Sequence, residues 1–566
     1  MAESKLYPLL IKLNQIRSEF GIDPAFEREQ ILKQLSKLPI RDSRDIKTYH
    51  DLLLFYIAYP DNPRISNLCK LELLRLTEVL RKMQKDEPDK FTRQYDGSGI
   101  AFSSVSWLPS FEGCRWLIQG SNKDLQLVWS DEFVAKLGNY LTQFASPAEQ
   151  DGLIDNRFDA KDWLMMASGN RVDKSNHDLK WLIRNFELLS CETKTREQLF
   201  EALGVEIKLQ LNDTTVSRTG NILKRRATYY QNDKLLKSFD TILKVNEPVL
   251  EFKALSGKEK SNIQHSTKSV LAARERETDP VFYAQKIYKA TVERGLDVYL
   301  FMMDIDHRLP IENYTGFVAY RNGVPIGYGG GWIFIDRCEI GVNIFETFRG
   351  GENNLIFTNI MRVYNQVFGV SKFVVQPYQF GEDNEEGLQS GAFWFYYKLG
   401  YRPSDSNIRV LAEKEWNKII SKKGYRSSIS TLKKFTESPV ELILKKSPIH
   451  FEPKQLSIAI TRYVAKKFDG NHQAALAWSM NILKNFRGAE GFQKWSANEK
   501  YTFKYLSILI AACTQQSDFS EEEQVSIVNL LRKKGSDELA FSLVLKKEIK
   551  LLNAMKKFVG KFDFKG

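Results

Sequence analysis

The chain has few cysteines and few prolines, and both shortages narrow the class of protein. The 5 cysteines among 566 residues are odd in number and far apart, and none lies in a CxxC pair or a Cys/His cluster. The sequence therefore supports neither a disulfide framework nor a zinc site, and we expect no metal. Only 17 prolines occur, which argues against long disordered or linker-dominated stretches.

Long apolar runs and a strong excess of one charge are also missing. The apolar stretch 52–59 is far shorter than the roughly 20 residues that cross a bilayer, and the first residues do not show the pattern of a secretory leader. We therefore expect a cytoplasmic protein with no membrane partner. The net charge of +12 comes from 82 basic and 70 acidic residues, so it permits an anionic partner without requiring one.

The length favours several domains, because 566 residues exceed what one hydrophobic core usually holds. Hydrophobic spacing predicts a mainly helical N-terminal region over 1–205 and a helical C-terminal region over 447–566. Between them, 206–280 has two strand-like stretches and many basic residues, and 281–446 is the most organised part. We predict an α+β or α/β protein in which a central mixed sheet is flanked by helices.

The basic connector contains a segment, 223–239, that has two interpretations. Its lysines and arginines surround two adjacent tyrosines, a mixture that stacks on and neutralises single-stranded nucleic acid such as part of a tRNA. The interpretation that we favour is a solvent-exposed basic hairpin. The polar stretch 256–269 is predicted to be a loop or linker, or a mobile loop near a substrate.

The central part, 281–446, alternates helical and strand patterns. Its clearest signal is an Asn-Gly pair between two apolar strands over 315–335, which predicts a β-hairpin. The other predicted elements are a helix over 281–295, strands over 296–303, 337–345 and 371–377, a Gly-rich turn before a helix over 355–369, a helix in 390–403 and a last strand in 438–446.

The helical stretch SGAFWFYYKLGYRP (390–403) resembles the last motif of the GNAT superfamily of N-acetyltransferases. The family pattern is Asn-x-x-Ala, three residues, Tyr, two residues and Leu-Gly-Phe. Two departures are Gln389, where Asn is usual, and Tyr401, where Phe is usual. The positions that carry the resemblance are Gln389, Ala392, Tyr396, Leu399, Gly400 and Tyr401.

The segment RGGENN (349–354) resembles the turn with which this family binds the pyrophosphate of coenzyme A. Such a turn works because backbone N–H groups at a helix N-terminus converge on the anion, and small residues let it approach closely. Glu352 and Asn354 stand where small residues are usual. An inward carboxylate at Glu352 would repel the ligand, whereas a carboxylate that caps the helix would leave the turn open.

The resemblance implies a donor substrate, acetyl-CoA or another acyl-CoA, and an amine-bearing acceptor. Strand residues would pair with the pantetheine amides of the donor through their backbone, and the turn would hold its phosphates. The thioester would lie where two central strands splay apart, around 343–345 and 373–376. The donor-binding residues implied in this way are Asn343, Ile344, Phe345, Arg349, Gly350, Gly351, Asn353 and Asn354.

The resemblance also implies two catalytic roles. Tyr396 takes the place of the general acid that protonates the leaving thiolate, and Glu339 that of the general base that takes a proton from the amine. The rivals for the base are Glu346, His307 and Asp336. Tyr396 could also be no more than a packed ring in an aromatic helix.

The acidic loop 378–389 either covers the acceptor pocket, where it would select a cationic or amino-bearing substrate, or is an ordinary solvated loop. For the whole protein, the interpretation that we favour is an acyltransferase. One alternative is a transferase that uses an aminoacyl-tRNA. The other is a catalytically inert ligand sensor or scaffold, which the departures at Glu352 and Asn354 favour.

Overall fold

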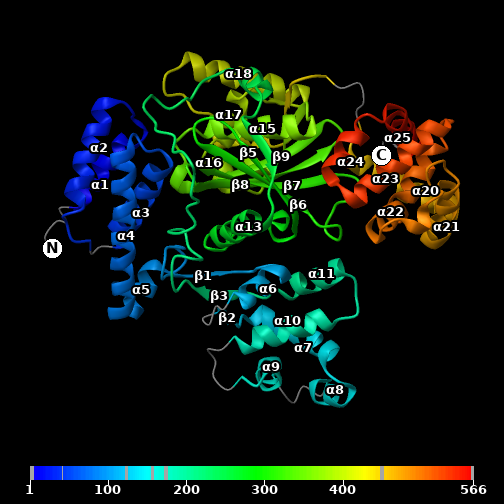
Figure 1. Ribbon diagram of the computed structural model, residues 1–566, viewed down its shortest axis with the longest axis horizontal. Helices are drawn as coiled ribbons and strands as arrows, with labels where there is room; N and C mark the ends of the chain where they lie inside the picture. The colour runs from blue at the N-terminus through cyan, green and yellow to red at the C-terminus, as the bar shows by residue number, and fades with distance from the viewer. Residues whose placement is uncertain are drawn as a thin grey trace.

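The computed structural model describes residues 6–40, 43–120, 125–154, 159–170, 176–446 and 451–562. A large mixed sheet occupies the centre of the molecule, and helical groups lie on three sides of it (Figure 1). No helix in these described ranges is long and apolar enough to cross a membrane.

The first helical group packs directly against the central sheet. Its third helix is buried over almost its whole second half, and its side chains belong to the same hydrophobic core as those of the sheet. The group is therefore continuous with the central domain. Its helices are α1 (Leu6–Gln15), α2 (Ile22–Leu35), α3 (Ser43–Ala58), α4 (Pro63–Asp86) and α5 (Pro88–Tyr95), with the 3-10 turn η1 (Ile16–Ser18) after α1.

The second group, drawn in cyan in Figure 1, has a core of its own and a small antiparallel sheet in the order β1-β3-β2. The first helices and this second group were predicted as one helical region, 1–205. The structure shows instead that they belong to two different hydrophobic cores. The elements are β1 (Ser104–Trp107), α6 (Phe111–Gln119), β2 (Leu125–Leu127), α7 (Asp131–Phe144), α8 (Pro147–Ile154), α9 (Ala160–Ser168), α10 (His177–Leu188), α11 (Thr193–Leu203) and β3 (Ile207–Gln210).

The central sheet has the strand order β11-β12-β10-β9-β8-β7-β6-β5-β4. In the described chain, β9 and β10 are its parallel pair and all other neighbours are antiparallel. The strands are β4 (Glu251–Ala254), β5 (Ala284–Thr291), β6 (Leu296–Met303), β7 (Asn313–Arg321), β8 (Val324–Phe334), β9 (Arg337–Ile344), β10 (Lys372–Val375), β11 (Arg402–Pro403) and β12 (Val440–Ile443).

Helices cover both faces of this sheet. On one face, Tyr364 of α15 donates a hydrogen bond to the carbonyl of Thr315 at 2.5 Å. On the other, Thr267 of α13 lies 3.1 Å from the hydroxyl of Tyr320. The helices of this part are α12 (Thr241–Asn246), α13 (Gly257–Ala272), α14 (Asp279–Phe282), α15 (Asn353–Phe368), α16 (Glu385–Gln389), α17 (Ala392–Lys398), α18 (Ser406–Ser421) and α19 (Ile429–Phe435), with the 3-10 turns η2 (Glu346–Phe348) and η3 (Pro377–Phe380).

The C-terminal helices form a bundle with a separate core, which also takes in Phe334 and Ile335 from the end of β8. The bundle lies at the far side of the sheet from α1–α5 (Figure 1). Its helices are α20 (Pro453–Phe468), α21 (His472–Lys484), α22 (Ala497–Thr514), α23 (Glu521–Ser536), α24 (Glu538–Leu545) and α25 (Ile549–Phe562), with the 3-10 turn η4 (Phe492–Lys494).

Most of the predicted central elements are confirmed. The hairpin β7–β8 turns at Asn322 and Gly323, both at positive φ as such a turn requires. The strands at 296–303, 337–345 and 371–377 and the helices at 355–369 and in 390–403 are present, and the last strand, β12, pairs with β10. The division of the whole chain into four domains remains a prediction.

Three predicted elements were wrong. The helix at 281–295 is strand β5, because its helix-like spacing is overridden by pairing with β4 and β6 on both sides. The loop at 256–269 is helix α13, in which the buried hydroxyls of Ser266 and Thr267 lie within hydrogen-bonding distance of the hydroxyl of Tyr320. The hairpin at 223–239 is an irregular segment without strands, in which Arg225 pairs with Asp297.

A buried carboxylate, Glu352, ties the central sheet to the segments around it. Only 1% of it is exposed, and it forms ion pairs of 2.7 Å with Arg294 and with Arg321. It also accepts a hydrogen bond of 2.8 Å from the backbone N–H of Leu236. The Arg321 guanidinium in turn lies 4.1 Å from the ring centre of Tyr59, just after α3. We call Glu352, Arg294 and Arg321 the buried ion cluster.

Replacing Glu352 by glutamine should destabilise the protein by about 3–5 kcal/mol, since it removes the buried carboxylate that the buried Arg321 and the half-buried Arg294 share. Urea unfolding, followed by tryptophan fluorescence, measures the loss. The control is Glu78→Gln, which breaks a pair whose side chains are 64% and 65% exposed and should cost about 0–1 kcal/mol. Equal losses in the two variants would contradict the role of the buried ion cluster.

Candidate active site

A cavity of about 1200 Å³ lies where β9 and β10 separate. The two strands pair at Arg337–Lys372, Cys338–Phe373 and Glu339–Val374, and the rest of β9 has no partner on that side in the described sheet. The backbone edge from Gly341 to Ile344 therefore lines the cavity. A strand edge of this kind offers free N–H and C=O groups to a ligand.

The cavity reaches both faces of the sheet. Asn353 and Tyr396 belong to the α15 side, because Tyr396 packs on Phe357 of α15. Thr278 and Tyr314 belong to the α13 side, which they share with α14. The opening between the strands thus joins a region beside the turn 349–354 to a region beside β7 and β8.

Six of the ten residues predicted to be catalytic or donor-binding line this cavity. Asn343 and Ile344 come from β9, Arg349 and Asn353 come from the turn and the start of α15, and Tyr396 comes from α17. The full set is Asn343, Ile344, Arg349, Asn353, Asn354 and Tyr396. The others, Glu339, Phe345, Gly350 and Gly351, do not line it.

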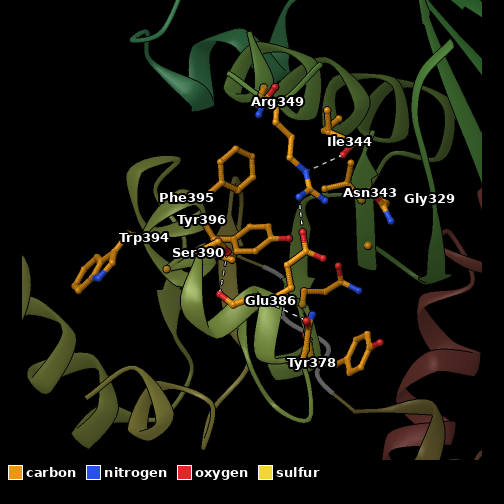
Figure 2. A pocket seen from close by; sticks show the side chains of 18 of the residues that line it. Gly329, Asn343, Ile344, Arg349, Tyr378, Glu386, Ser390, Trp394, Phe395 and Tyr396 are labelled. Carbon is orange, nitrogen blue, oxygen red and sulfur yellow. Dashed lines mark hydrogen bonds and ion pairs between the residues drawn. The ribbon is translucent and has the colours of Figure 1, made fainter. Parts of the chain in front are cut away.

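Tyr396 points its hydroxyl into the cavity, towards Arg349 and Glu386 (Figure 2). Its ring is 4% exposed and packs edge-on against Phe357 and Tyr401. Burial raises the pKa of Tyr396 well above its ordinary value, so the phenol keeps its proton at neutral pH. No protein group in the described residues is within hydrogen-bonding distance of this hydroxyl, which leaves it available to a ligand.

Arg349 reaches across the cavity from the turn. Its Nε donates to the carbonyl of Ile344 at 3.3 Å, and its guanidinium pairs with Glu386 on α16 (Figure 2). Glu386 belongs to the segment 378–389, predicted as an acidic loop; the structure forms η3 and α16 within it, and Tyr378, Gln379 and Asn384 of this segment also line the cavity. Its carboxylate at Glu386 pairs with Arg349, the cation that the sequence analysis assigned to a phosphate.

The unusual residues of the turn do not place a negative charge in the cavity. Glu352 is directed into the buried ion cluster, away from Arg349. Gly350 has a φ of +88°, which favours glycine. At Gly351 a Cβ atom would lie 2.8 Å from the hydroxyl of Tyr59, so this glycine is needed for packing. The turn therefore keeps its shape through contacts with the N-terminal helices.

Two buried polar atoms at the cavity have no hydrogen-bond partner in the described protein. They are the Oδ1 of Asn353 and the Nε1 of Trp394, and both residues line the cavity. Unsatisfied buried polar groups are uncommon in folded proteins. The indole N–H of Trp394 and the N–H groups at the start of α15, which have no acceptor within the helix, are donors that suit an anionic group, whereas the Oδ1 of Asn353 needs a donor from a ligand.

The predicted base, Glu339, is engaged elsewhere. Its carboxylate accepts hydrogen bonds from Gln376 at 2.7 Å and from Arg337 at 3.1 Å. Among its rivals, Glu346 is exposed on η2 and Asp336 accepts a hydrogen bond from Ser371 at 2.9 Å. None of these three carboxylates lines the cavity.

Glu277, which the sequence did not single out, does line the cavity on the α13 side. It accepts a hydrogen bond of 2.8 Å from the N–H of Ser110 and a second from the hydroxyl of that residue. Burial raises its pKa to about 7, against the lowering effect of these bonds. Glu277 lies in a charged loop between α13 and α14, and no motif or spacing in this part of the sequence marks it as a site residue. Beside it, the rings of Tyr314 and Trp332 stack with centres 4.2 Å apart.

The other rival base, His307, lies in a separate cavity of about 290 Å³ between α11 and the end of β6. It bonds Asp304 at 2.6 Å and Glu197 at 2.9 Å. Burial opposes its charge, but these hydrogen bonds outweigh burial and raise its pKa to about 9. His307 is thus a charged link between the second helical group and the sheet.

Comparison with known proteins gave no matching family model, no matching curated protein and no matching solved structure. The site is therefore interpreted from its own geometry and chemistry.

The His307 link predicts a pH-dependent stability. Because the folded pKa of about 9 lies above the ordinary value of 6.5, its contribution is complete below pH 6.5 and is lost as the pH rises through 9. His307→Gln should cost about 1.5–3 kcal/mol at pH 6. Thermal unfolding from pH 6 to 10 should show the difference from the wild type shrinking. His472→Gln, at an exposed position, is the control, and a pH-independent difference at His307 would contradict the link.

Proposed function

We propose that the protein is an N-acyltransferase that moves an acyl group from coenzyme A to an amine, as the resemblance to the GNAT superfamily implies. The observation that carries this proposal is a single cavity that joins the free edge of β9, the turn 349–354 and the hydroxyl of Tyr396. The central sheet, with its parallel pair β9–β10 and α15 between them, is compatible with the GNAT fold and supports it.

The size of the cavity supports a reaction between two substrates. Pockets for one small ligand usually measure about 300–1,000 Å³, and this cavity of about 1200 Å³ is larger. Its two sides also differ in chemistry. The α15 side carries Arg349 and a helix N-terminus, whereas the α13 side carries the stacked Tyr314 and Trp332 and the carboxyl of Glu277. We assign the first side to the donor and the second to the acceptor.

On the donor side, the backbone of Asn343 and Ile344 would bind the amides of the pantetheine arm in the manner of an added strand. Arg349 and the start of α15, at Asn353 and Asn354, would hold the phosphates, because a helix N-terminus and a guanidinium both favour anions. Bound acyl-CoA supplies an activated thioester whose carbonyl carbon the amine can attack.

On the acceptor side, a carboxylate must take a proton from the attacking amine as the carbon–nitrogen bond forms. Glu277 suits this role better than Glu339, because it lines the cavity and its pKa is about 7. Tyr396 would give its proton to the sulfur as the carbon–sulfur bond breaks. Its raised pKa keeps the phenol protonated until then.

We propose coenzyme A, and not an aminoacyl-tRNA, as the donor. In the basic segment 223–239, the ring of Tyr229 lies 5.1 Å from the guanidinium of Arg294 and 5.7 Å from that of Arg321. The ring of this half-buried tyrosine thus packs against two guanidinium groups of the protein, which compete with stacking on a base. Exposed cations such as Lys224 and Arg226 remain, but a few surface charges are a weak signal for a nucleic acid.

Calorimetric titration with coenzyme A and acetyl-CoA tests the donor site. The wild type should bind with a Kd in the micromolar range, about −8 kcal/mol, and Arg349→Ala should weaken binding by about tenfold or more, since it removes a charge-assisted contact. Arg487→Ala, at an exposed ion pair on the C-terminal bundle, is the control. No binding by the wild type would reject the proposal and favour a sensor or scaffold.

In the same titration, one variant is expected to bind coenzyme A more tightly than the wild type. Glu386→Gln removes the carboxylate that pairs with Arg349 and competes with the phosphates of the donor. Binding should become tighter by no more than about fivefold, because an exposed pair is worth about 0–1 kcal/mol. Weaker binding in this variant would show that Glu386 supports the ligand and does not compete with it.

Tyr396→Phe tests the chemistry. Loss of a general acid should lower kcat by about 10²–10⁴-fold and leave the KM for acetyl-CoA nearly unchanged. The assay measures free thiol released from acetyl-CoA in the presence of a panel of primary amines. Tyr397→Phe is a matched control, since this buried neighbour packs on Trp416 and does not line the cavity. Equal activity in the two variants would show that Tyr396 has only a packing role and is not the general acid.

A further inference from the structure

We infer that the N-terminal helices form the outer wall of the donor turn and that Arg17 is its main positioning residue. This inference rests on the proposed function, because it assigns the turn 349–354, with the residues 347–348 that lead into it, to the donor. It adds a role for a part of the chain, α1–α3, to which the sequence assigned none.

Arg17 and Ser18 hold the carbonyl groups of the turn. The Nη2 of Arg17 donates to the carbonyl of Thr347 at 3.0 Å and also to the carbonyl of Arg349. The hydroxyl of Ser18 donates to the carbonyl of Gly350 at 3.1 Å. Both residues lie in η1, between α1 and α2, about 330 residues away along the chain.

Arg17 is itself held in place by the end of α3. Its guanidinium lies 4.2 Å from the ring centre of Phe55, and Phe55 stacks on Tyr59 with centres 4.8 Å apart. Tyr59 then lies against Gly351 and within 3.5 Å of the backbone N–H of Glu352. A column of three side chains therefore runs along the turn from Thr347 to Glu352, the residue just before α15.

These contacts fix the direction of the peptide groups in the turn. In a planar trans peptide the C=O and the next N–H point to opposite sides. Hydrogen bonds that draw the carbonyl of Arg349 towards Arg17 therefore direct the N–H of Gly350 away from it. A turn whose donors are already oriented loses less conformational freedom when a ligand binds, and this gain appears as affinity.

Arg17 acts through the turn and not on the ligand, because neither it nor Ser18 lines the cavity. A residue of this kind affects donor affinity and the mobility of the turn, whereas it leaves the proton-transfer groups in place. The alternative is that Arg17 only joins the helical group to the sheet. The experiment has to separate these two roles.

The test compares Arg17→Ala with Lys12→Ala by hydrogen–deuterium exchange of the amides 346–354 and by titration with coenzyme A. Lys12 pairs with Glu27 on the same helical group, with side chains 55% and 39% exposed, so it is a matched control. Arg17→Ala should speed exchange in the turn and weaken coenzyme A binding by about tenfold, equivalent to one charged hydrogen bond. Arg17→Lys, which keeps the charge, should restore part of the affinity.

Ser18→Ala keeps the test decisive if Arg17→Ala fails to fold, since it removes one hydrogen bond at an accessible position. It should speed exchange at Gly350 and Gly351 and weaken binding about threefold. Unchanged exchange and unchanged affinity in these variants, with a wild type that binds coenzyme A, would overturn the inference. If the wild type does not bind coenzyme A, the proposed function fails, and the exchange comparison alone decides whether Arg17 fixes the turn.

Discussion

The burial of the Glu352 carboxylate between Arg294 and Arg321 is the interaction on which the arrangement around the site depends. A buried charge is very costly unless it is paired and hydrogen-bonded. Glu352 meets this condition only when the ends of β5 and β7, the connector at Leu236 and the start of α15 come together. The cluster thus selects one relative placement of the sheet, the connector and the first helices.

The same interaction explains how a turn that contains a glutamate presents none of that charge to the cavity. With its carboxylate directed into the protein, Glu352 begins α15 as a residue that faces inward. The glycines before it serve the packing of Tyr59 and a positive φ at Gly350. A turn with a glutamate at this position can therefore keep that carboxylate out of the cavity, provided that other parts of the chain pair with it.

Local sequence signals predicted the elements that depend on local interactions. The Asn322–Gly323 turn, the apolar strand β6 and the glycine-ended helix α15 follow from their own residues. Helix α13 and strand β5 were missed because their secondary structure depends on partners that are distant in the sequence. These partners are Tyr320 for α13 and the strands β4 and β6 for β5. Tyr396 and Arg349 were found through spacing in a motif. Glu277 and Arg17 do not belong to a motif. Each contacts residues that are more than 160 positions away in the sequence, and the sequence alone does not show such contacts.

The ion pair between Arg349 and Glu386 shows how the free protein can keep a cation ready beside the cavity. Its two side chains are 48% and 69% exposed, so breaking it costs little, about 0–1 kcal/mol. A ligand phosphate would replace one carboxylate by a group with more charge and more acceptor oxygens. Because Glu386 belongs to the acidic loop and Arg349 to the turn, this exchange would change what the loop contacts when the donor binds. Entry of a phosphate-bearing ligand and the contacts of the segment 378–389 would then be linked by one arginine.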